Sequence, residues 1–159
     1  MAFVNIYLSL GSNLGDREAN ILEALRRMDE AFGTHYLSLS KIIETRPMGF
    51  SGGKFLNAAV LYRIPEPVEG PFEILRQVKA IERALGRTDP PKYDAGGKRI
   101  YRSRVIDIDI LFYGAERIDV PELTIPHKGI AERPFVMVPL LEIAKPSLKK
   151  AFPEFFEST

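Results

Sequence analysis

Cysteine is absent from the 159-residue sequence, which excludes disulfides, cysteine-ligated zinc and thiol catalysis. An excess of charge of one sign is also missing, because 22 Lys and Arg residues stand against 21 Asp and Glu residues. General nucleic-acid and membrane-surface binders are usually basic, so we expect neither kind of partner. No apolar run approaches the roughly 18 residues of a membrane span. Residues 1–6 lack a charged signal-peptide leader, so we expect a cytoplasmic protein.

The remaining composition is that of an ordinary globular protein, with 45% hydrophobic and 27% charged residues. A chain of this length corresponds to about one domain and buries roughly two-thirds of its unfolded surface. No internal repeat or interdomain linker is visible in the sequence. We therefore expect a single domain over residues 1–159.

Periodic apolar residues predict the secondary structure. Alternation predicts strands at 3–10, 37–43, 55–62 and 105–113, with a shorter strand around 118. Apolar stripes predict one helix between Asp16 and Gly33 and another between Pro71 and Gly86. The order β-α-β-β-α-β predicts an α+β fold. Specifically, we expect a ferredoxin-like sandwich, with a mainly antiparallel sheet covered on one face by two helices.

Three segments carry turn residues without periodicity, and an apolar stretch near the end contains a proline. The irregular segments are 45–54, 87–103 and 121–127, and the apolar stretch is 135–141, broken by Pro139. A loop as long as 87–103 is uncommon inside a compact domain, and such loops are often functional. Neither glycine-glycine-lysine stretch, at 52–54 or 96–98, has the spacing of a phosphate-binding P-loop.

Two aspartates project from one face of the strand predicted at 105–113. Asp107 and Asp109 alternate with apolar residues, and we expect Ile106, Ile108, Ile110 and Phe112 on the opposite face. Their Cα atoms stand roughly 6–7 Å apart, so their oxygens can converge on a cation. Carboxylate oxygens favour Mg²⁺ or Mn²⁺ over zinc. A solvated strand face, or ion pairs with Arg102 and Arg104, remains an alternative.

Arginines border the long loop, with Arg87 at its start and Arg104 three residues before Asp107. Guanidinium groups can neutralise the charge that develops on a transferred phosphoryl group. Phe55 and Asn57 share a strand face and could hold a flat heterocycle by stacking and in-plane hydrogen bonds. Solubilising surface charges and a core phenylalanine are the plainer alternatives, and His127 is ambiguous by itself.

Five short segments, spread over nearly the whole chain, share their order with one known family. They are residues 10–16 (LGSNLGD), 55–60 (FLNAAV), 81–87 (IERALGR), 104–111 (RVIDIDIL) and 123–127 (LTIPH). Together they resemble the 6-hydroxymethyl-7,8-dihydropterin pyrophosphokinases of folate biosynthesis. The resemblance implies transfer of diphosphate from ATP to the pterin hydroxymethyl group, which releases AMP. It also implies long mobile active-site loops, near residues 11–16, 45–54 and 87–104.

The same resemblance assigns roles to individual residues. Asp107 and Asp109 match carboxylates that bind two Mg²⁺ ions, with Asp107 also near the substrate hydroxyl, and Arg87 and Arg104 match arginines that engage ATP and assist transfer. The other positions of the ATP site are Ile110, Thr124, His127 and Arg133. The pterin site comprises Thr45, Met48, Phe55, Asn57, Asp107 and Phe135, in which the two phenylalanines sandwich the ring. The implied partners are these small molecules alone, and we expect a monomer.

The third loop departs from the family pattern, with Ile100, Tyr101 and Arg102 at places where the family prefers other residues. The sequence offers no compelling general base, although Asp107 could relay the proton. Two other functional classes remain open. Paired strand aspartates also serve two-metal nucleotidyl transferases and cyclases, and a similar sheet can bind RNA when its exposed face carries aromatic and basic residues.

Overall fold

The computed structural model describes residues 2–46, 53–86, 92–93, 95–96, 99–100, 105–130 and 132–156. Three of the predicted site residues, Met48, Arg87 and Arg104, lie outside the described residues. So do Tyr101 and Arg102 of the atypical loop, and only the backbone of Ile100 is described.

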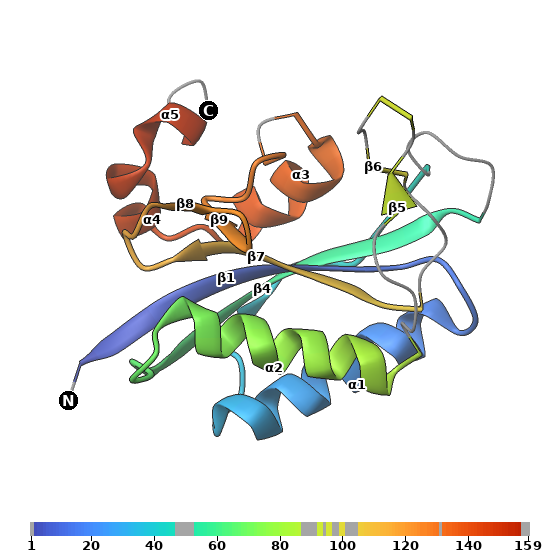
Figure 1. Ribbon diagram of the computed structural model, residues 1–159, viewed down its shortest axis with the longest axis horizontal. Coiled ribbons are helices and arrows are strands. Elements are labelled where there is room, and N and C mark those ends of the chain that lie inside the picture. Colours follow the sequence, from blue (N-terminus) through green and yellow to red (C-terminus); the bar gives the residue numbers. More distant parts are fainter. Residues whose placement is uncertain are drawn as a thin grey trace.

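A five-stranded antiparallel sheet forms the centre of the fold (Figure 1). Its middle strand, β1 (Phe3–Ser12), pairs with β4 (Phe55–Pro65) on one side and with β7 (Asp107–Tyr113) on the other. Two short strands, β2 (Ser38–Leu39) and β3 (Ile43–Thr45), pair with the outer side of β4. All these pairings are antiparallel, as expected for a ferredoxin-like sandwich. One end of the sheet therefore brings together the last residues of β1 and the first residues of β4 and β7.

Two helices pack against one face of this sheet, and their ends follow from local sequence. In α1 (Arg17–Phe32), the Asp16 carboxylate accepts the Ala19 backbone N–H at 3.1 Å, and Gly33 ends the helix with a φ of 73°. Helix α2 (Pro71–Ala84) begins with proline at its first position and ends two residues before Gly86. Among the helices of the described ranges, none is long and apolar enough to cross a bilayer.

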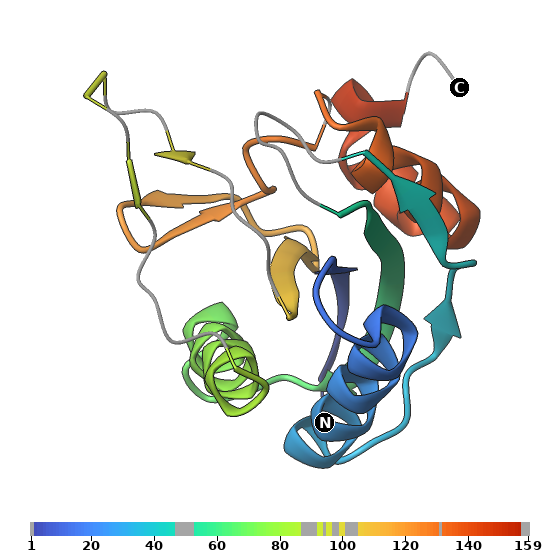
Figure 2. The ribbon, with the colours of Figure 1, turned by 90° about the vertical axis from the view of Figure 1, so that its right-hand side faces the viewer.

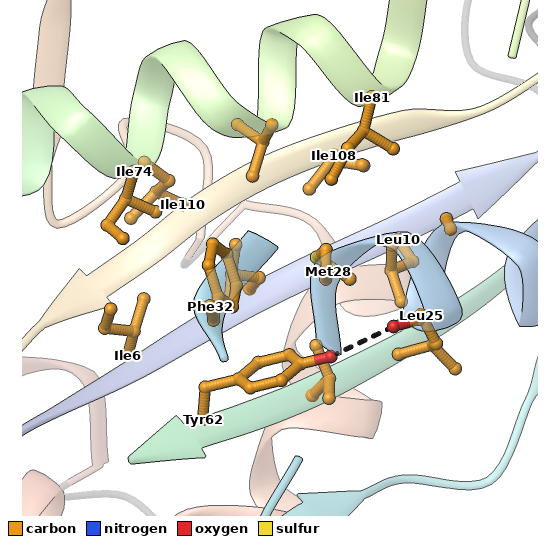
Figure 3. Close-up of a cluster of buried hydrophobic side chains, with 14 of the residues drawn as sticks. Ile6, Leu10, Leu25, Met28, Phe32, Tyr62, Ile74, Ile81, Ile108 and Ile110 are labelled. Atoms are coloured by element: carbon orange, nitrogen blue, oxygen red, sulfur yellow. Dashed lines mark hydrogen bonds between the residues drawn. The ribbon is translucent and has the colours of Figure 1, made fainter. Parts of the chain in front are cut away.

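The larger core lies between the two helices and the sheet (Figure 3). Its labelled members are Ile6, Leu10, Leu25, Met28, Phe32, Tyr62, Ile74, Ile81, Ile108 and Ile110. The Tyr62 hydroxyl reaches α1, where it lies 2.5 Å from the Asp29 Oδ1 atom and 3.3 Å from the Leu25 carbonyl oxygen. Predicted helical stripes and strand alternation therefore meet in one cluster, which confirms the faces assigned to both helices.

The opposite face of the sheet is also covered, which corrects the expectation of helices on one face alone (Figure 2). It packs against α3 (Pro134–Ile143), α4 (Pro146–Ala151) and α5 (Pro153–Phe156). The apolar stretch 135–141 is helical, with Pro134 at the first position, where proline fits a helix, and with Pro139 inside it. That segment is almost uniformly apolar and lacks the polar stripe by which a surface helix is detected.

The strand predicted at 37–43 is divided into β2 and β3, because Ser40 interrupts it. The Ser40 hydroxyl accepts the Ala59 backbone N–H at 2.8 Å, so a side chain replaces a backbone carbonyl in the ladder. Segments expected to be irregular contain short strands: β9 (Leu123–Ile125) pairs with β8 (Ile118–Val120), and β5 (Lys92–Tyr93) pairs with β6 (Arg99–Ile100).

A bulge in β7 places Phe112 on the face opposite to the one expected. The pairing with β1 shifts between Leu8, opposite Ile110, and Tyr7, opposite Phe112. Leu111 and Phe112 therefore both belong to the cluster beneath the C-terminal helices, whereas Ile108 and Ile110 face α1 and α2 as predicted. Strict alternation along the strand fails only beyond Ile110.

Candidate functional site

A pocket opens at the end of the sheet where β1 ends and β4 and β7 begin. Its cavity volume is about 50 Å³, and the site is partly open to solvent. Its lining combines the ends of β1, β3, β4 and β7 with the start of α3, and consists of Ser9, Gly11, Thr45, Arg46, Phe55, Asn57, Asp107, Asp109, Arg133 and Phe135. Aromatic, amide and carboxylate groups therefore converge on one space, here called the first pocket.

The last residues of β1 form the floor of the first pocket. Gly11 lies between Asn57 of β4 and Asp107 of β7, and Ser9 lies beside Asp109 in the same register. A Cβ atom on Gly11 would stand 3.1 Å from the Asn57 Oδ1 atom, so the absence of a side chain keeps this floor open. Gly11 was expected in the loop near residues 11–16, but it is a strand residue that lies between Asn57 and Asp107.

One wall of the first pocket carries an amide held in a fixed orientation. Asn57 is 4% exposed, and its Nδ2 atom donates to the Thr45 hydroxyl at 2.5 Å. Because Nδ2 is engaged in this way, the buried amide presents a fixed pattern of donor and acceptor to a ligand. Phe55 and Phe135, from β4 and α3, line the same space and provide apolar surfaces for a flat ring. The wall thus offers stacking and polar contacts together.

Asp107 and Asp109 both line the first pocket, as strand alternation predicted. The residue between them is anchored from the other side, since the Ile108 backbone N–H donates to the Glu82 Oε2 atom of α2 at 2.8 Å. Glu82 is 1% exposed, and Lys79 lies 3.7 Å from its other carboxylate oxygen. This contact fixes the outer edge of β7, which has no neighbouring strand on that side in the described sheet.

A second pocket adjoins the first on the other side of Asp109. It lies between α2, β7 and the β8–β9 hairpin. Its lining comprises Leu75, Lys79, Ile108, Asp109, Ile110, Pro121, Glu122, Leu123, Thr124, His127, Lys128 and Arg133. Four basic side chains, one hydroxyl and two carboxylates, Asp109 and Glu122, surround this space, and Lys79 also lies beside Glu82. The excess of basic groups suits an anionic ligand.

His127 faces Asp109 in a defined orientation. Its Nδ1 atom accepts the Gly129 backbone N–H at 3.2 Å, so the neutral ring carries its proton on Nε2. That Nε2 atom lies 3.7 Å from the Asp109 Oδ1 atom. The backbone N–H of His127 also donates to the Leu111 carbonyl oxygen at 3.2 Å, which fastens this turn to β7. His127 therefore presents an N–H group to the space beside Asp109.

Arg133 belongs to both pockets, as Asp109 does. It is the residue that precedes α3, and its guanidinium carbon lies 6.0 Å from the centre of the Phe135 ring. The guanidinium passes directly over Gly129, where any Cβ atom would collide with it. Glycine at position 129 leaves room for this path, which places the positive charge of Arg133 between the two pockets.

The structure thus brings together ten of the thirteen predicted site residues. Seven line the first pocket: Thr45, Phe55, Asn57, Asp107, Asp109, Arg133 and Phe135. Five line the second: Ile110, Thr124 and His127, together with Asp109 and Arg133, which belong to both. The sequence reasoning missed Ser9, Gly11, Arg46, Lys79, Glu122 and Lys128 as lining residues. Of these, Ser9 could have been found, because alternation placed it on the face of β1 that points away from the helices.

The oxygen donors of the first pocket fit a hard divalent cation whose remaining coordination positions are filled by a bound ligand. Asp107 and Asp109 supply carboxylate oxygens to one space, the sequence offers no thiol, and the nearest imidazole nitrogen described, His127 Nε2, lies 3.7 Å from the Asp109 Oδ1 atom. Within the described ranges, no group of three or more His, Cys, Asp and Glu side chains could hold a metal by itself. Mg²⁺ is often bound by one or two carboxylates, with water and substrate phosphates as the other ligands. The site has this character.

Comparison with known proteins gives a consistent family. The family model for 7,8-dihydro-6-hydroxymethylpterin-pyrophosphokinase matches residues 7–145. A 2-amino-4-hydroxy-6-hydroxymethyldihydropteridine pyrophosphokinase of Porphyromonas gingivalis is 43% identical over 141 residues, which cover 87% of this chain and 90% of that protein. The mitochondrial folate synthesis bifunctional protein of Pisum sativum is 40% identical over 139 residues, covering 87% of this chain.

These relatives differ in length. The chain spans 25% of the pea protein, and it covers 43% of the Plasmodium falciparum HPPK-DHPS wild type solved with pteroate. That structure aligns with 98% of this chain at a TM-score of 0.65 and 15% identity, a likeness of fold alone. The family match covers more than half of the chain, and the bacterial relative matches nearly end to end. The chain belongs to the 7,8-dihydro-6-hydroxymethylpterin-pyrophosphokinase family, the ATP-dependent pyrophosphokinases of folate biosynthesis.

Proposed function

We propose that this chain binds 6-hydroxymethyl-7,8-dihydropterin in the first pocket and ATP in the second, and transfers diphosphate between them. The observation that carries this assignment is that the two pockets share Asp109 and Arg133. A reaction that joins two substrates needs their reacting groups held at a common boundary. That boundary here contains a carboxylate and a guanidinium, the groups that suit a cation and a phosphate.

The first pocket supports the pterin assignment through its mixed walls. Phe55 and Phe135 provide faces for stacking on the bicyclic ring, and the Asn57 amide provides in-plane hydrogen bonds. The Thr45 hydroxyl fixes the orientation of this amide. Asp107 lies at the pocket end nearest to β7, where the hydroxymethyl group would point toward the second pocket. Met48, which lies outside the described residues, stays a sequence-based member of this site.

The second pocket supports the nucleotide assignment through its charges. Thr124 and Ile110 line it beside His127 and Arg133, which can approach phosphate oxygens. Asp107 and Asp109 would hold two Mg²⁺ ions together with the phosphates of ATP. When bound, Mg²⁺ neutralises charge on the phosphates and orients them for displacement. Arg87 and Arg104 remain assigned to the phosphates from the sequence resemblance.

The reaction is an in-line displacement on the β-phosphorus of ATP. The hydroxymethyl oxygen forms a bond to that phosphorus, the bond to the α,β-bridging oxygen breaks, and AMP leaves. The residues of this chain contribute mainly by positioning: the stacked ring and the Asn57 amide hold the pterin, and Arg133 and His127 hold the phosphates. Asp107 is the carboxylate that we propose relays the hydroxyl proton.

Product analysis with an Asp109→Ala variant tests this function. The wild-type protein should convert ATP and the hydroxymethyl pterin to AMP and pterin diphosphate, whereas release of diphosphate or a cyclic nucleotide would indicate another two-metal enzyme. The variant should lose AMP formation but still bind the pterin in calorimetry. Asp119→Ala is the matched control, because Asp119 is an exposed strand aspartate outside both pocket linings. Near-normal turnover of the Asp109 variant would refute the metal assignment.

The cellular setting and assembly belong to the same proposal. We propose that the chain acts as a monomeric single domain in the cytoplasm, as inferred above from the sequence and the family resemblance. The curated pea relative is a mitochondrial protein, so location varies within the family. Sedimentation of the purified protein with and without both substrates measures the oligomeric state directly.

A further inference from the structure

We infer that Arg17 is a positioning residue for the pterin pocket, acting through Glu44 and the backbone of Lys54. This role rests on the proposed function, because it concerns the affinity of the first pocket for its ring. Arg17 does not line either pocket. Its guanidinium instead joins the two strand ends from which the pterin residues project.

The geometry of the guanidinium is that of a bridge. The Arg17 Nη1 atom donates to the Lys54 carbonyl oxygen at 2.8 Å, and the Nη2 atom lies 2.9 Å from the Glu44 Oε2 atom. Lys54 immediately precedes Phe55, and Glu44 immediately precedes Thr45. A planar guanidinium can hold two acceptors at once in a fixed relation, which a lysine ammonium does less well. One side chain therefore links the segments that begin both pocket walls, in addition to the backbone pairing of Thr45 with Phe55 and the ion pair between Lys54 and Glu44 at 3.8 Å.

The strand that carries Thr45 needs such support. Strand β3 has three residues and pairs only with β4 in the described sheet, so few backbone hydrogen bonds hold it. Thr45 in turn accepts the hydrogen bond that orients the Asn57 amide. Motion of β3 would therefore be transmitted to the amide that recognises the pterin.

Helix α1 provides a rigid anchor for the bridge. Arg17 is its first residue, and the helix is fixed to the core through Ile21, Leu25 and Met28. A cation in the first turn of a helix interacts unfavourably with the helix dipole, so the charge of Arg17 does not stabilise α1. The contacts of Arg17 with Glu44 and Lys54 offset this unfavourable interaction, and they connect α1 to β3 and to the residue before β4.

Neighbouring contacts reinforce the same connection. The Asn13 Nδ2 atom donates to the Gly53 carbonyl oxygen at 3.1 Å. The Asn20 amide of α1 donates to the Ser12 hydroxyl at 3.2 Å and to the Leu14 carbonyl oxygen at 2.8 Å. The connection between β1 and α1 is thereby fastened both to the helix and to the residues before Phe55. Arg17 is the member of this set that also reaches β3.

The test compares substrate affinities of Arg17→Met, Arg17→Lys and Glu44→Gln with Arg26→Met. Arg26 is the matched control, since it also forms ion pairs on α1, with Glu23 and Glu30, but it reaches neither strand. Steady-state kinetics and calorimetry would give KM and Kd separately for the pterin and for a non-hydrolysable ATP analogue. Glu44→Gln keeps the shape of a half-exposed side chain and serves if Arg17→Met fails to fold.

We expect Arg17→Met to raise the KM and Kd for the pterin about 5- to 30-fold, from the loss of one ion pair and one hydrogen bond. Affinity for the ATP analogue should stay within about twofold, and Arg17→Lys should restore only part of the loss. Combining Arg17→Met with Glu44→Gln should add little to the single change. If Arg17→Met weakened binding of the pterin and of the ATP analogue equally, or if Arg26→Met also weakened pterin binding selectively, the positioning role of Arg17 would be overturned. A wild-type protein that binds no pterin would instead refute the proposed function.

Discussion

Adding a single methyl group at Gly11 should weaken pterin binding while leaving the fold and the nucleotide site intact. Gly11 is a regular strand residue on the pocket floor, so Gly11→Ala requires no unusual backbone conformation. Its new Cβ atom would stand 3.1 Å from the Asn57 Oδ1 atom and 3.6 Å from the Phe55 Cδ1 atom. The first distance is too short for an undisturbed contact, so the amide must move.

The cost of that movement can be worked from the contacts of Asn57. The amide is buried and donates to Thr45 at 2.5 Å, so displacing it weakens a hydrogen bond worth about 0.5–1.5 kcal/mol. This corresponds to a pterin Kd that rises about 2- to 13-fold, since 1.4 kcal/mol is a factor of ten. The effect on the ATP analogue should be negligible, because Gly11 does not line the second pocket.

Calorimetric measurement of the pterin Kd tests this explanation on four proteins: wild type, Gly11→Ala, Asn57→Ala and the double variant. If the methyl group acts by moving the Asn57 amide, its effect should largely disappear once that amide is removed. The double variant should then bind the pterin about as weakly as Asn57→Ala. Wild-type affinity in Gly11→Ala, or simple addition of the two losses, would refute the reasoning.

Two further predictions concern stability. Glu82→Leu should lower the free energy of unfolding in urea by about 1–3 kcal/mol, because it leaves the Ile108 N–H without its buried acceptor; an unchanged urea midpoint would contradict this. Tyr113 is fully buried, and desolvation, followed by the charges of Glu66, Glu116 and Glu73, raises its pKa to about 12. Since its unfolded value is about 10, stability is fully present below pH 10 and is lost as the pH rises toward 12. Tyr113→Phe should make that loss shallower, and an identical alkaline unfolding profile would argue against it.

The acid pair and the amide wall were predictable because strand alternation is a local rule. Asp107 and Asp109 face one pocket because they are two residues apart on a strand, whatever else the sheet does. The same rule placed Phe55 and Asn57 together. Helix ends were equally local, since Asp16 caps α1 and Gly33 ends it. These features need no knowledge of which strands are neighbours.

The pocket floor was not predictable in this way, because it depends on pairing between distant segments. Ser9 and Gly11 become site residues only when β1 lies between β4 and β7. Lys79 likewise enters the second pocket because α2 packs beside β7. The position of Arg133 at the boundary depends on the packing of α3 over the sheet, and the sequence of α3 carried no amphipathic signal for it. Such residues are set by topology rather than by spacing.

The position of the bulge in β7 explains why Phe112 lies on an unexpected face while Asp107 and Asp109 share the face that alternation predicts. It lies beyond Ile110, so the alternation that orients Asp107 and Asp109 is undisturbed. After the bulge, Leu111 and Phe112 both face the C-terminal helices, and Phe112 contacts the rings of Phe152, Phe155 and Phe156. This larger apolar surface on the acidic face of β7 helps to secure the layer that also contains α3. Since Arg133 and Phe135 lie at the start of α3, the irregularity that defeated the sequence pattern supports the boundary where the two substrates are proposed to meet.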